Sequence, residues 1–202
     1  MPGDGSPYDV RMPPDGDLRA RLRDVLGPDP LAPLPVDTVA AGVLVPVVDL
    51  GGAPTLVLTR RSEHLTRHPG EISFPGGIAD EGDGSLETTA LRELEEELGI
   101  AASSVEVLGA LPPVHTVVSG VLITPFVGWI AERPSFRPDA SEIAEVLEFA
   151  LADLIAAEEP IELAHGDRVH RGWAYPMGDD VVWGATGQVL HSLLVALAGE
   201  RV

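Results

Sequence analysis

The stretch that decides the fold runs from Arg92 to Gly99 and reads RELEEELG. At about 100° per residue, Glu93, Glu96 and Glu97 fall within an arc of roughly 100° on a helix, whereas the leucines fall on another side. Acidic side chains at these spacings repel one another unless something neutralises them. The pattern is typical either of a solvated helix face or of a face that holds a metal ion.

Two features around this stretch favour the metal. The turn Pro75-Gly76-Gly77 precedes it, and glycine allows the backbone to approach a phosphate closely. The chain has no cysteine, and hard carboxylate oxygens suit Mg²⁺ or Mn²⁺ rather than zinc or copper. We therefore expect Glu93, Glu96 and Glu97 to hold Mg²⁺ or Mn²⁺ in a hydrolase of a phosphate anhydride.

Length and charge limit what the chain can be. Its 202 residues suffice for one substantial core, and a net charge of −19 disfavours binding to the phosphate backbone of nucleic acid. The N-terminus lacks the basic and apolar regions of a signal peptide, and no apolar run is long enough to span a membrane. We expect a cytoplasmic protein without membrane partners, with a mobile leader over residues 1–16 and a single domain over 17–202.

Hydrophobic periodicity predicts the other elements. It predicts helices over 17–26, 86–98, 147–157 and 186–198, and strands over 36–48, 55–59, 105–111, 121–130 and 169–175. The first two strands are expected to form a hairpin. Ser85 can cap the helix over 86–98, and Gly99 can end it. This mixture predicts an α+β fold with helices packed on a mixed sheet.

The acidic stretch and the preceding turn resemble the signature of the Nudix hydrolases. That signature is G-x5-E-x7-R-E-U-x-E-E-x-G-U, where U is aliphatic, and the chain matches every fixed position from Arg92 to Ile100. The resemblance implies a Nudix-type α/β/α sandwich with a mixed β-sheet and a metal-binding helix. It also implies an enzyme that uses Mg²⁺ or Mn²⁺ to hydrolyse a small-molecule nucleotide substrate.

The chain departs from this signature in the loop before the helix. Arg92 follows Gly77 by fifteen residues instead of fourteen. Counted back from Arg92, Gly84 stands where the signature has its first Glu. We infer a one-residue insertion in the loop, with Asp83 or Glu87 in place of the missing carboxylate.

The resemblance also implies roles for single residues. Glu93 and Glu97 would carry most of the metal coordination, Glu96 would be a ligand or orient one, and Arg92 would brace these carboxylates. The general base of the family comes either from the signature or from a Glu on a distant loop. The candidates in this chain are Glu93, Glu97, Glu142 and Glu145. Glu142 is the leading one outside the helix, and an exposed loop acid is its alternative interpretation.

A second resemblance, over Val57–Gly77, narrows the substrate. This segment is similar to the additional signature of the coenzyme A pyrophosphatase branch, L-L-T-x-R-[SA]-x3-R-x3-G-x3-F-P-G-G. Val57 replaces the first Leu and Thr66 replaces the second Arg, with Arg67 one position later. The resemblance implies hydrolysis of coenzyme A or a derivative to adenosine 3′,5′-bisphosphate and a 4′-phosphopantetheine product.

Positive charge gathers just before the glycine turn. We interpret Arg60, Arg61 and Arg67 as a clamp on the substrate's phosphates, with Gly76 and Gly77 admitting the substrate close to the backbone. A surface cluster at a strand end is the alternative interpretation. Another nucleoside diphosphate derivative, such as ADP-ribose or a nucleotide sugar, is the alternative substrate. A ligand-sensing module without catalysis is the alternative to an enzyme.

The remaining aromatic and aliphatic side chains are interpreted as packing residues. Trp129, Trp173 and Trp183 are expected to pack in the core or on strands rather than to serve as platforms for a base. The apolar stripe of the last helix is interpreted as core, with a homodimer contact as the alternative.

Overall fold

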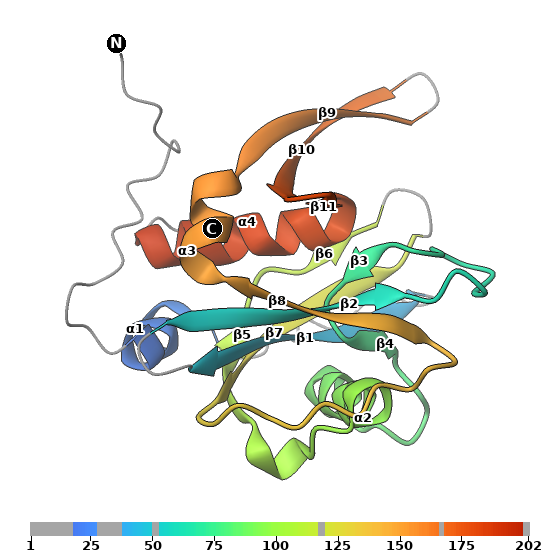
Figure 1. The fold of residues 1–202 in the computed structure, drawn as a ribbon, viewed down its shortest axis with the longest axis vertical. Coiled ribbons are helices and arrows are strands. Elements are labelled where there is room, and N and C mark those ends of the chain that lie inside the picture. Colours follow the sequence, from blue (N-terminus) through green and yellow to red (C-terminus); the bar gives the residue numbers. More distant parts are fainter. Residues whose placement is uncertain (1–17, 28–37, 50–52, 117–119, 166–167, 200–202) are drawn as a thin grey trace.

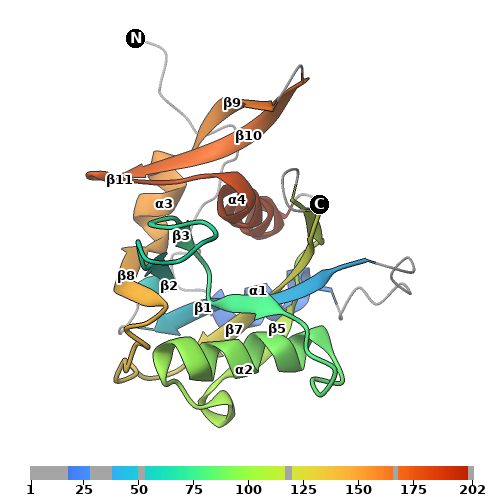
Figure 2. The ribbon, with the colours of Figure 1, turned by 90° about the vertical axis from the view of Figure 1, so that its right-hand side faces the viewer.

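A mixed sheet lies between helices on its two faces (Figure 1). The structure is a computed structural model and describes residues 18–27, 38–49, 53–116, 120–165 and 168–199. The predicted leader over residues 1–16 lies outside the described residues. Helix α2 covers one face of the sheet, and α3 and α4 lie on the other side (Figures 1 and 2). The predicted α+β sandwich is confirmed.

Helices and strands are interspersed along the chain. In sequence order they are α1 Leu18–Val25, β1 Ala40–Asp49, β2 Pro54–Arg61, β3 Ile72–Ser73, β4 Gly76–Ile78, α2 Leu86–Leu98, the 3₁₀ helix η1 Ala102–Ser104, β5 Glu106–Ala110, β6 Val114–His115, β7 Leu122–Ile130, β8 Ile143–Ala150, α3 Leu151–Ala157, β9 Glu159–His165, β10 Arg168–Met177, β11 Asp180–Val182 and α4 Gly184–Ala198. No helix of the described residues is long and apolar enough to cross a membrane.

Strand β1 is the centre of the main sheet. It runs parallel to β7 over Ala40–Val48, and antiparallel to β4 at its start and to β2 at its end. Strand β2 also pairs with β3 and, along its whole length, with β8. The hairpin predicted for the first two strands is confirmed. A second sheet, β11-β10-β9, lies on the far side of α4 from the main sheet (Figure 2).

Helix α2 packs on β1 at a glycine. A Cβ atom on Gly42 would lie 2.1 Å from the carbonyl oxygen of Leu86, so only glycine lets the first turn of α2 come this close. Beyond this contact the helix buries Ala90 and Leu94 completely. The Ser85 hydroxyl accepts a hydrogen bond from the backbone N–H of Thr88, and Gly99 ends the helix with φ 68°. Both predicted caps are therefore confirmed.

The prediction of one helix over 147–157 is wrong in its first part. Residues 143–150 form β8, where Leu147 lies opposite Leu58 of β2, and only Leu151–Ala157 is helical. The sequence of 147–150 suits a helix, but β2 offers a continuous ladder of hydrogen bonds and Leu147 is buried there. Periodicity also missed β9, which pairs with β10.

Helix α4 joins the second sheet to the core. Its apolar face, including Val189, Leu190 and Leu193, is buried, which confirms the interpretation as core. His191 Nδ1 lies 2.9 Å from the buried carboxylate of Glu158, and the His191 ring stacks on Trp173 with 3.9 Å between centroids. Because Trp173 lies on β10, this contact fixes the β9–β10 hairpin to α4.

The contact at Gly42 yields a test of how α2 is positioned. In a Gly42→Ala variant, the added Cβ meets backbone rather than a movable side chain. We expect the free energy of unfolding to fall by about 1–3 kcal/mol. Urea denaturation measures this change, with Gly82→Ala as the matched control because a Cβ there meets nothing within 4 Å. Equal stability of the two variants would show that α2 does not depend on this contact.

Candidate active site

The acidic face of α2 meets the glycine turn at β4. The Glu93 carboxylate lies against Gly77, where an added Cβ would come within 2.3 Å of Oε1. The backbone N–H of Gly76 donates to the Glu97 carboxylate. Glu93 is partly buried and Glu97 is only 4% exposed. The structure thus brings together two acids of the helix and both glycines that the sequence singled out.

Glu97 is the most perturbed carboxyl group of this face. Burial, together with repulsion from Glu93 and Glu142, raises its pKa to about 8. The charge of Arg61 and the Gly76 N–H act in the opposite direction. Among the described residues, Glu97 Oε2 is buried and has no hydrogen-bond partner. A buried carboxylate oxygen without a partner, crowded by other carboxylates, is a position that a cation would stabilise.

Glu142 joins the acids of the helix from a distant part of the chain. It lies in the turn before β8, and its carbonyl oxygen accepts the backbone N–H of Ser62 at 2.7 Å. Burial raises the pKa of Glu93, and repulsion from Glu96 and Glu142 adds to this effect. Glu142 therefore acts on both Glu93 and Glu97. Glu145, the other candidate outside the helix, is directed to Arg60 instead.

Asp83 takes the place of the carboxylate that the loop lacks. Arg92 donates from Nε to Asp83 Oδ1 at 2.8 Å and from Nη2 to Oδ2 at 3.0 Å, which is a bidentate pair. The Thr89 hydroxyl and the backbone N–H of Asp80 also donate to Oδ2. Arg92 and these donors hold the pKa of Asp83 well below its usual range. Asp83, rather than Glu87, is thus the partner of Arg92.

Arg92 connects this loop acid to the acidic face of the helix. Its Nη1 donates to Glu93 at 2.8 Å and to Glu96 at 2.9 Å. Within the part of the chain that the structure describes, no group of three or more His, Asp or Glu side chains is arranged to hold a metal ion. Glu93 and Glu96 are each held by Arg92 rather than gathered with Glu97.

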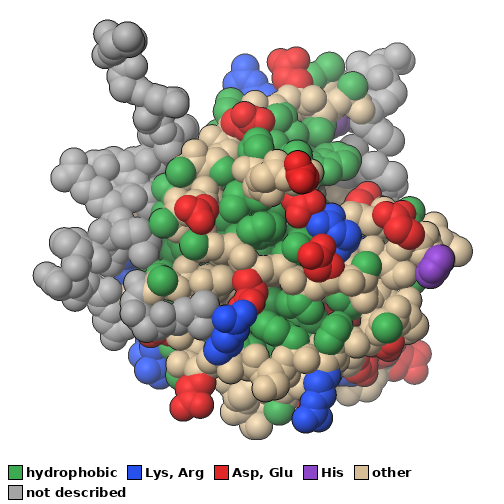
Figure 3. Space-filling view, viewed as in Figure 1, with side chains coloured by type: hydrophobic (Ala, Val, Ile, Leu, Met, Phe, Trp, Pro, Cys, Tyr) green, Lys and Arg blue, Asp and Glu red, His purple; other side chains and the backbone are tan. Residues whose placement is uncertain are grey.

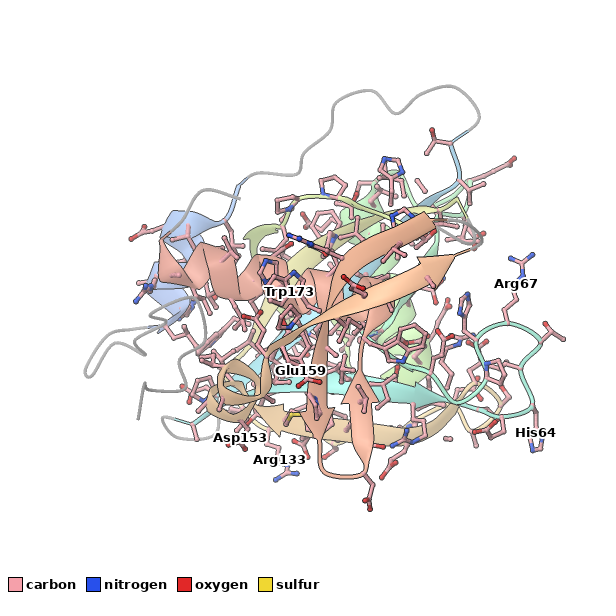
Figure 4. The ribbon with its side chains drawn as sticks, turned by 90° about the horizontal axis from the view of Figure 1, so that it is seen from above. His64, Arg67, Arg133, Asp153, Glu159 and Trp173 are labelled. Carbon is pink, nitrogen blue, oxygen red and sulfur yellow. The ribbon has the colours of Figure 1, made fainter. Side chains whose placement is uncertain are left out.

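The three arginines expected to clamp phosphate lie in different surroundings. Arg61 is close enough to Glu97 to lower the pKa of that acid. Arg60 instead donates to Glu145 at 3.1 Å and to Asp180 at 2.8 Å. Arg67 is exposed, and Figure 4 shows it pointing outward from its loop. The structure brings only Arg61 of the three to the acids of α2.

A sequence profile of the NUDIX domain matches residues 38–171, which include the whole acidic helix and Glu142. The chain belongs to the Nudix family. It is accordingly a Nudix hydrolase, an enzyme that acts on pyrophosphate bonds. Enzymes of this family bind small nucleotide-derived substrates and generally use divalent metals such as Mg²⁺ or Mn²⁺.

Several known proteins are similar to this Nudix chain. The "Uncharacterized Nudix hydrolase NudL" of Pectobacterium atrosepticum is 41% identical over 160 residues, which are 78% of this chain and 82% of the relative. A protein of the same name from Shigella flexneri is 38% identical over 81% of this chain and 85% of its own length. A C. elegans Ap4A hydrolase in a binary complex aligns with a TM-score of 0.51 and 19% identity, covering 58% of this chain and 84% of its own. That last likeness concerns the fold alone.

Sequence reasoning missed two side chains around the Nudix helix and β2 and misinterpreted a third side chain, that of Trp183. Thr89 is fully buried and donates to Asp83, and a hydroxyl among the buried positions of an amphipathic helix was the available signal. Asp180 pairs with Arg60 across 120 positions of sequence, which no local pattern indicates. Trp183 is 49% exposed, so its interpretation as a packing residue is wrong, whereas Trp129 is buried.

The Asp83–Arg92 pair yields a prediction for activity and acid stability. Asp83→Asn removes the charge that orients Arg92, and we expect turnover to fall by about 10- to 100-fold. Because folding lowers the pKa of Asp83 from 3.8, its stabilising contribution is complete above that value and is lost as the pH falls through the lower folded value. The Tm of the variant should therefore lie below that of the wild type at pH 7, and the gap should narrow below about pH 4.

Thermal unfolding at pH 7 and below about pH 4 measures the difference in Tm between Asp83→Asn and the wild type. Asp153→Asn, which alters an exposed acid on α3, is the matched control and should leave Tm and turnover unchanged. A gap for Asp83→Asn that stayed constant down to about pH 3 would contradict the ion-pair assignment.

Proposed function

We propose that this Nudix hydrolase uses Mg²⁺ or Mn²⁺ to hydrolyse the diphosphate of coenzyme A or of a coenzyme A derivative. The products would be adenosine 3′,5′-bisphosphate and 4′-phosphopantetheine or its acyl derivative. The observation that carries the proposal is the buried Glu97 carboxylate, which has one oxygen without a partner among the described residues. Repulsion from Glu93 and Glu142 and attraction to Arg61 meet at this group.

The acids of α2 offer donor oxygens for a divalent cation, and Glu93 and Glu96 would turn from Arg92 toward Glu97 to bind it together. Glu93, Glu96 and Glu97 would hold it, because they offer hard oxygen ligands and because a cation relieves their mutual repulsion. When bound, such a cation neutralises charge on the non-bridging and leaving oxygens of a diphosphate and acidifies a water molecule. Arg92 contacts Glu93 and Glu96 and is itself fixed by Asp83, so it orients the ligands rather than the substrate.

Glu142 is the general base that we propose outside the helix. It is exposed to solvent, and it lies near enough to Glu93 and Glu97 to raise the pKa of both. An acid in this position can accept a proton from a water that attacks the diphosphate. Glu145 is a weaker candidate because its carboxylate is paired with Arg60.

The coenzyme A assignment is supported by where its signature segment lies. The segment Val57–Gly77 starts on β2 and ends on β4. Its first part places Arg61 near Glu97. Its last part places the Gly76 N–H on the Glu97 carboxylate and Gly77 against the Glu93 carboxylate. The segment that resembles the coenzyme A branch therefore borders the proposed metal-binding acids at both of its ends.

A substrate panel tests the proposal. With Mg²⁺ or Mn²⁺, we expect kcat/KM for coenzyme A to exceed that for ADP-ribose at least about tenfold. Coenzyme A carries a 3′-phosphate that ADP-ribose lacks, and one charged hydrogen bond to this phosphate contributes about 1.5–3 kcal/mol. Mass spectrometry should detect 4′-phosphopantetheine. Arg61→Ala should lower kcat/KM by roughly 10- to 100-fold. Arg133→Ala, which removes an exposed arginine paired with Glu148, is the matched control and should have no effect.

The panel separates the alternatives. A preference for ADP-ribose would replace coenzyme A by another nucleoside diphosphate derivative and leave the roles of the acids on α2 unaffected. Absence of turnover with every substrate and both metals would contradict the coenzyme A assignment and favour the ligand-sensing alternative.

A further inference from the structure

A cavity of about 320 Å³ lies beside β2, apart from the acids of α2. Its size is that of a small-molecule site. The residues that matter for its chemistry come from four segments. They are Arg60 of β2, Glu63 and Glu71 of the following loop, Asp179 and Asp180 at the turn into β11, and Trp183 before α4. Segments that are far apart in the sequence thus form one concave surface. The acids of α2 are not among its lining residues.

Trp183 gives this cavity an exposed aromatic plane. Its side chain is 49% exposed, and that of neighbouring Val181 is 48% exposed. A large aromatic ring is expected to be mostly buried in a chain that has space for it in the core. Stacking of a nucleic-acid base on such a ring contributes about 1–3 kcal/mol. The exposed indole therefore favours a flat, apolar-faced ligand.

The charges that line the cavity exclude a phosphate. Arg60 is the single basic residue among the lining residues, and four carboxylates surround it. Figure 3 shows acidic side chains spread over the face of the molecule that carries β8 and β11. A phosphate placed there would be repelled by more charges than attract it. The ligand of this cavity must be neutral or cationic.

Arg60 and Asp180 retain unused hydrogen-bonding groups. Of the five N–H donors of a guanidinium, Arg60 uses one at Nε for Glu145 and one at Nη2 for Asp180, which leaves three. Asp180 accepts with Oδ1, and its Oδ2 has no hydrogen-bond partner among the described residues. Donors and an acceptor thus stand side by side next to an aromatic ring. This combination matches an aminopurine, which has ring nitrogens that accept and an exocyclic amine that donates.

We propose that this cavity binds the adenine base of the substrate. The base stacks on Trp183, its amine donates to the Asp180 carboxylate, and its ring nitrogens accept from Arg60. The proposal rests on the proposed function for the remainder of the substrate. Adenine is recognised in the cavity, whereas the diphosphate is recognised at Arg61 and the acids of α2.

The cavity and the acids of α2 are joined by short stretches of chain. Arg60 lines the cavity and the adjacent Arg61 acts on Glu97. Because successive side chains of a strand point to opposite faces, the two sites lie on the two faces of β2 at its end, and a substrate that reaches both passes around that end. Ile72 also lines the cavity and is four residues before Gly76, whose N–H donates to Glu97. Four residues of extended chain span at most about 14 Å. An extended nucleoside diphosphate covers a distance of this order.

Binding of free adenosine and inosine, measured by ligand-observed NMR without added metal, tests the cavity directly. Inosine has a carbonyl in place of the amine and would face the carboxylates, so we expect it to bind at least about tenfold more weakly than adenosine. Trp183→Ala should weaken adenosine binding at least about tenfold, and Trp183→Phe should keep it within about threefold. Val169→Ala, at an exposed apolar residue of the β9–β10 hairpin, is the control and should change nothing.

Asp180→Asn provides a second variant that preserves the shape of the side chain. It should reduce the preference for adenosine over inosine to less than about threefold. In hydrolysis of coenzyme A, Trp183→Ala should raise KM about tenfold and leave kcat within about threefold. Equal binding of adenosine and inosine, or an unchanged adenosine affinity in Trp183→Ala, would overturn the proposal. Binding of choline in place of adenosine would also overturn it.

The outcomes separate this proposal from the proposed function. If coenzyme A is hydrolysed and Trp183→Ala leaves KM unchanged, the cavity is not the adenine site and the proposed function stands. If no diphosphate is hydrolysed but Trp183→Ala still abolishes adenosine binding, the cavity assignment stands and the proposed function fails.

Discussion

Repulsion among carboxylates on one face of α2 is the constraint to which the rest of the site is fitted. Glu93 and Glu97 are both shielded from water, and Glu142 from the turn before β8 adds a third charge that acts on them. The structure opposes this repulsion with Arg92, Arg61 and the N–H of Gly76. One oxygen of Glu97 still has no partner among the described residues. We propose a divalent cation as the counter-charge that this arrangement lacks.

The close packing of α2 on β1 holds these charges in place. Gly42 lets the first turn of the helix touch the strand, and Gly77 leaves space for the Glu93 carboxylate on the neighbouring β4. The bidentate pair of Asp83 and Arg92 then fixes the loop before the helix to its acidic face. Backbone packing and charge pairing therefore act on the same few side chains.

The sequence predicts those features of the fold that depend on residues close to one another in the chain. The helix over 86–98, both of its caps and its acidic arc follow from residues within one turn of each other, and the structure confirms the helix and caps. The choice between Asp83 and Glu87 needed the fold, because only the path of the loop decides which acid reaches Arg92. Sequence predicts a helix over 147–150 because the β2 partners of these residues lie 89 to 95 positions away. The different surroundings of Arg60 and Arg61 depend on Asp180, 120 positions from Arg60, and on Glu97, 36 positions from Arg61.

Titration of the protein with Mn²⁺, followed by electron paramagnetic resonance, tests most directly whether the acids of α2 bind the metal. Two single variants are compared, Glu97→Gln and Glu95→Gln. Each removes one negative charge from α2, but Glu95 is exposed and lies outside the acidic arc. We expect Glu97→Gln to weaken Mn²⁺ binding at least about tenfold and Glu95→Gln to change it less than about threefold. Equal Mn²⁺ affinity in the two variants would contradict the assignment of this helix face as the metal site.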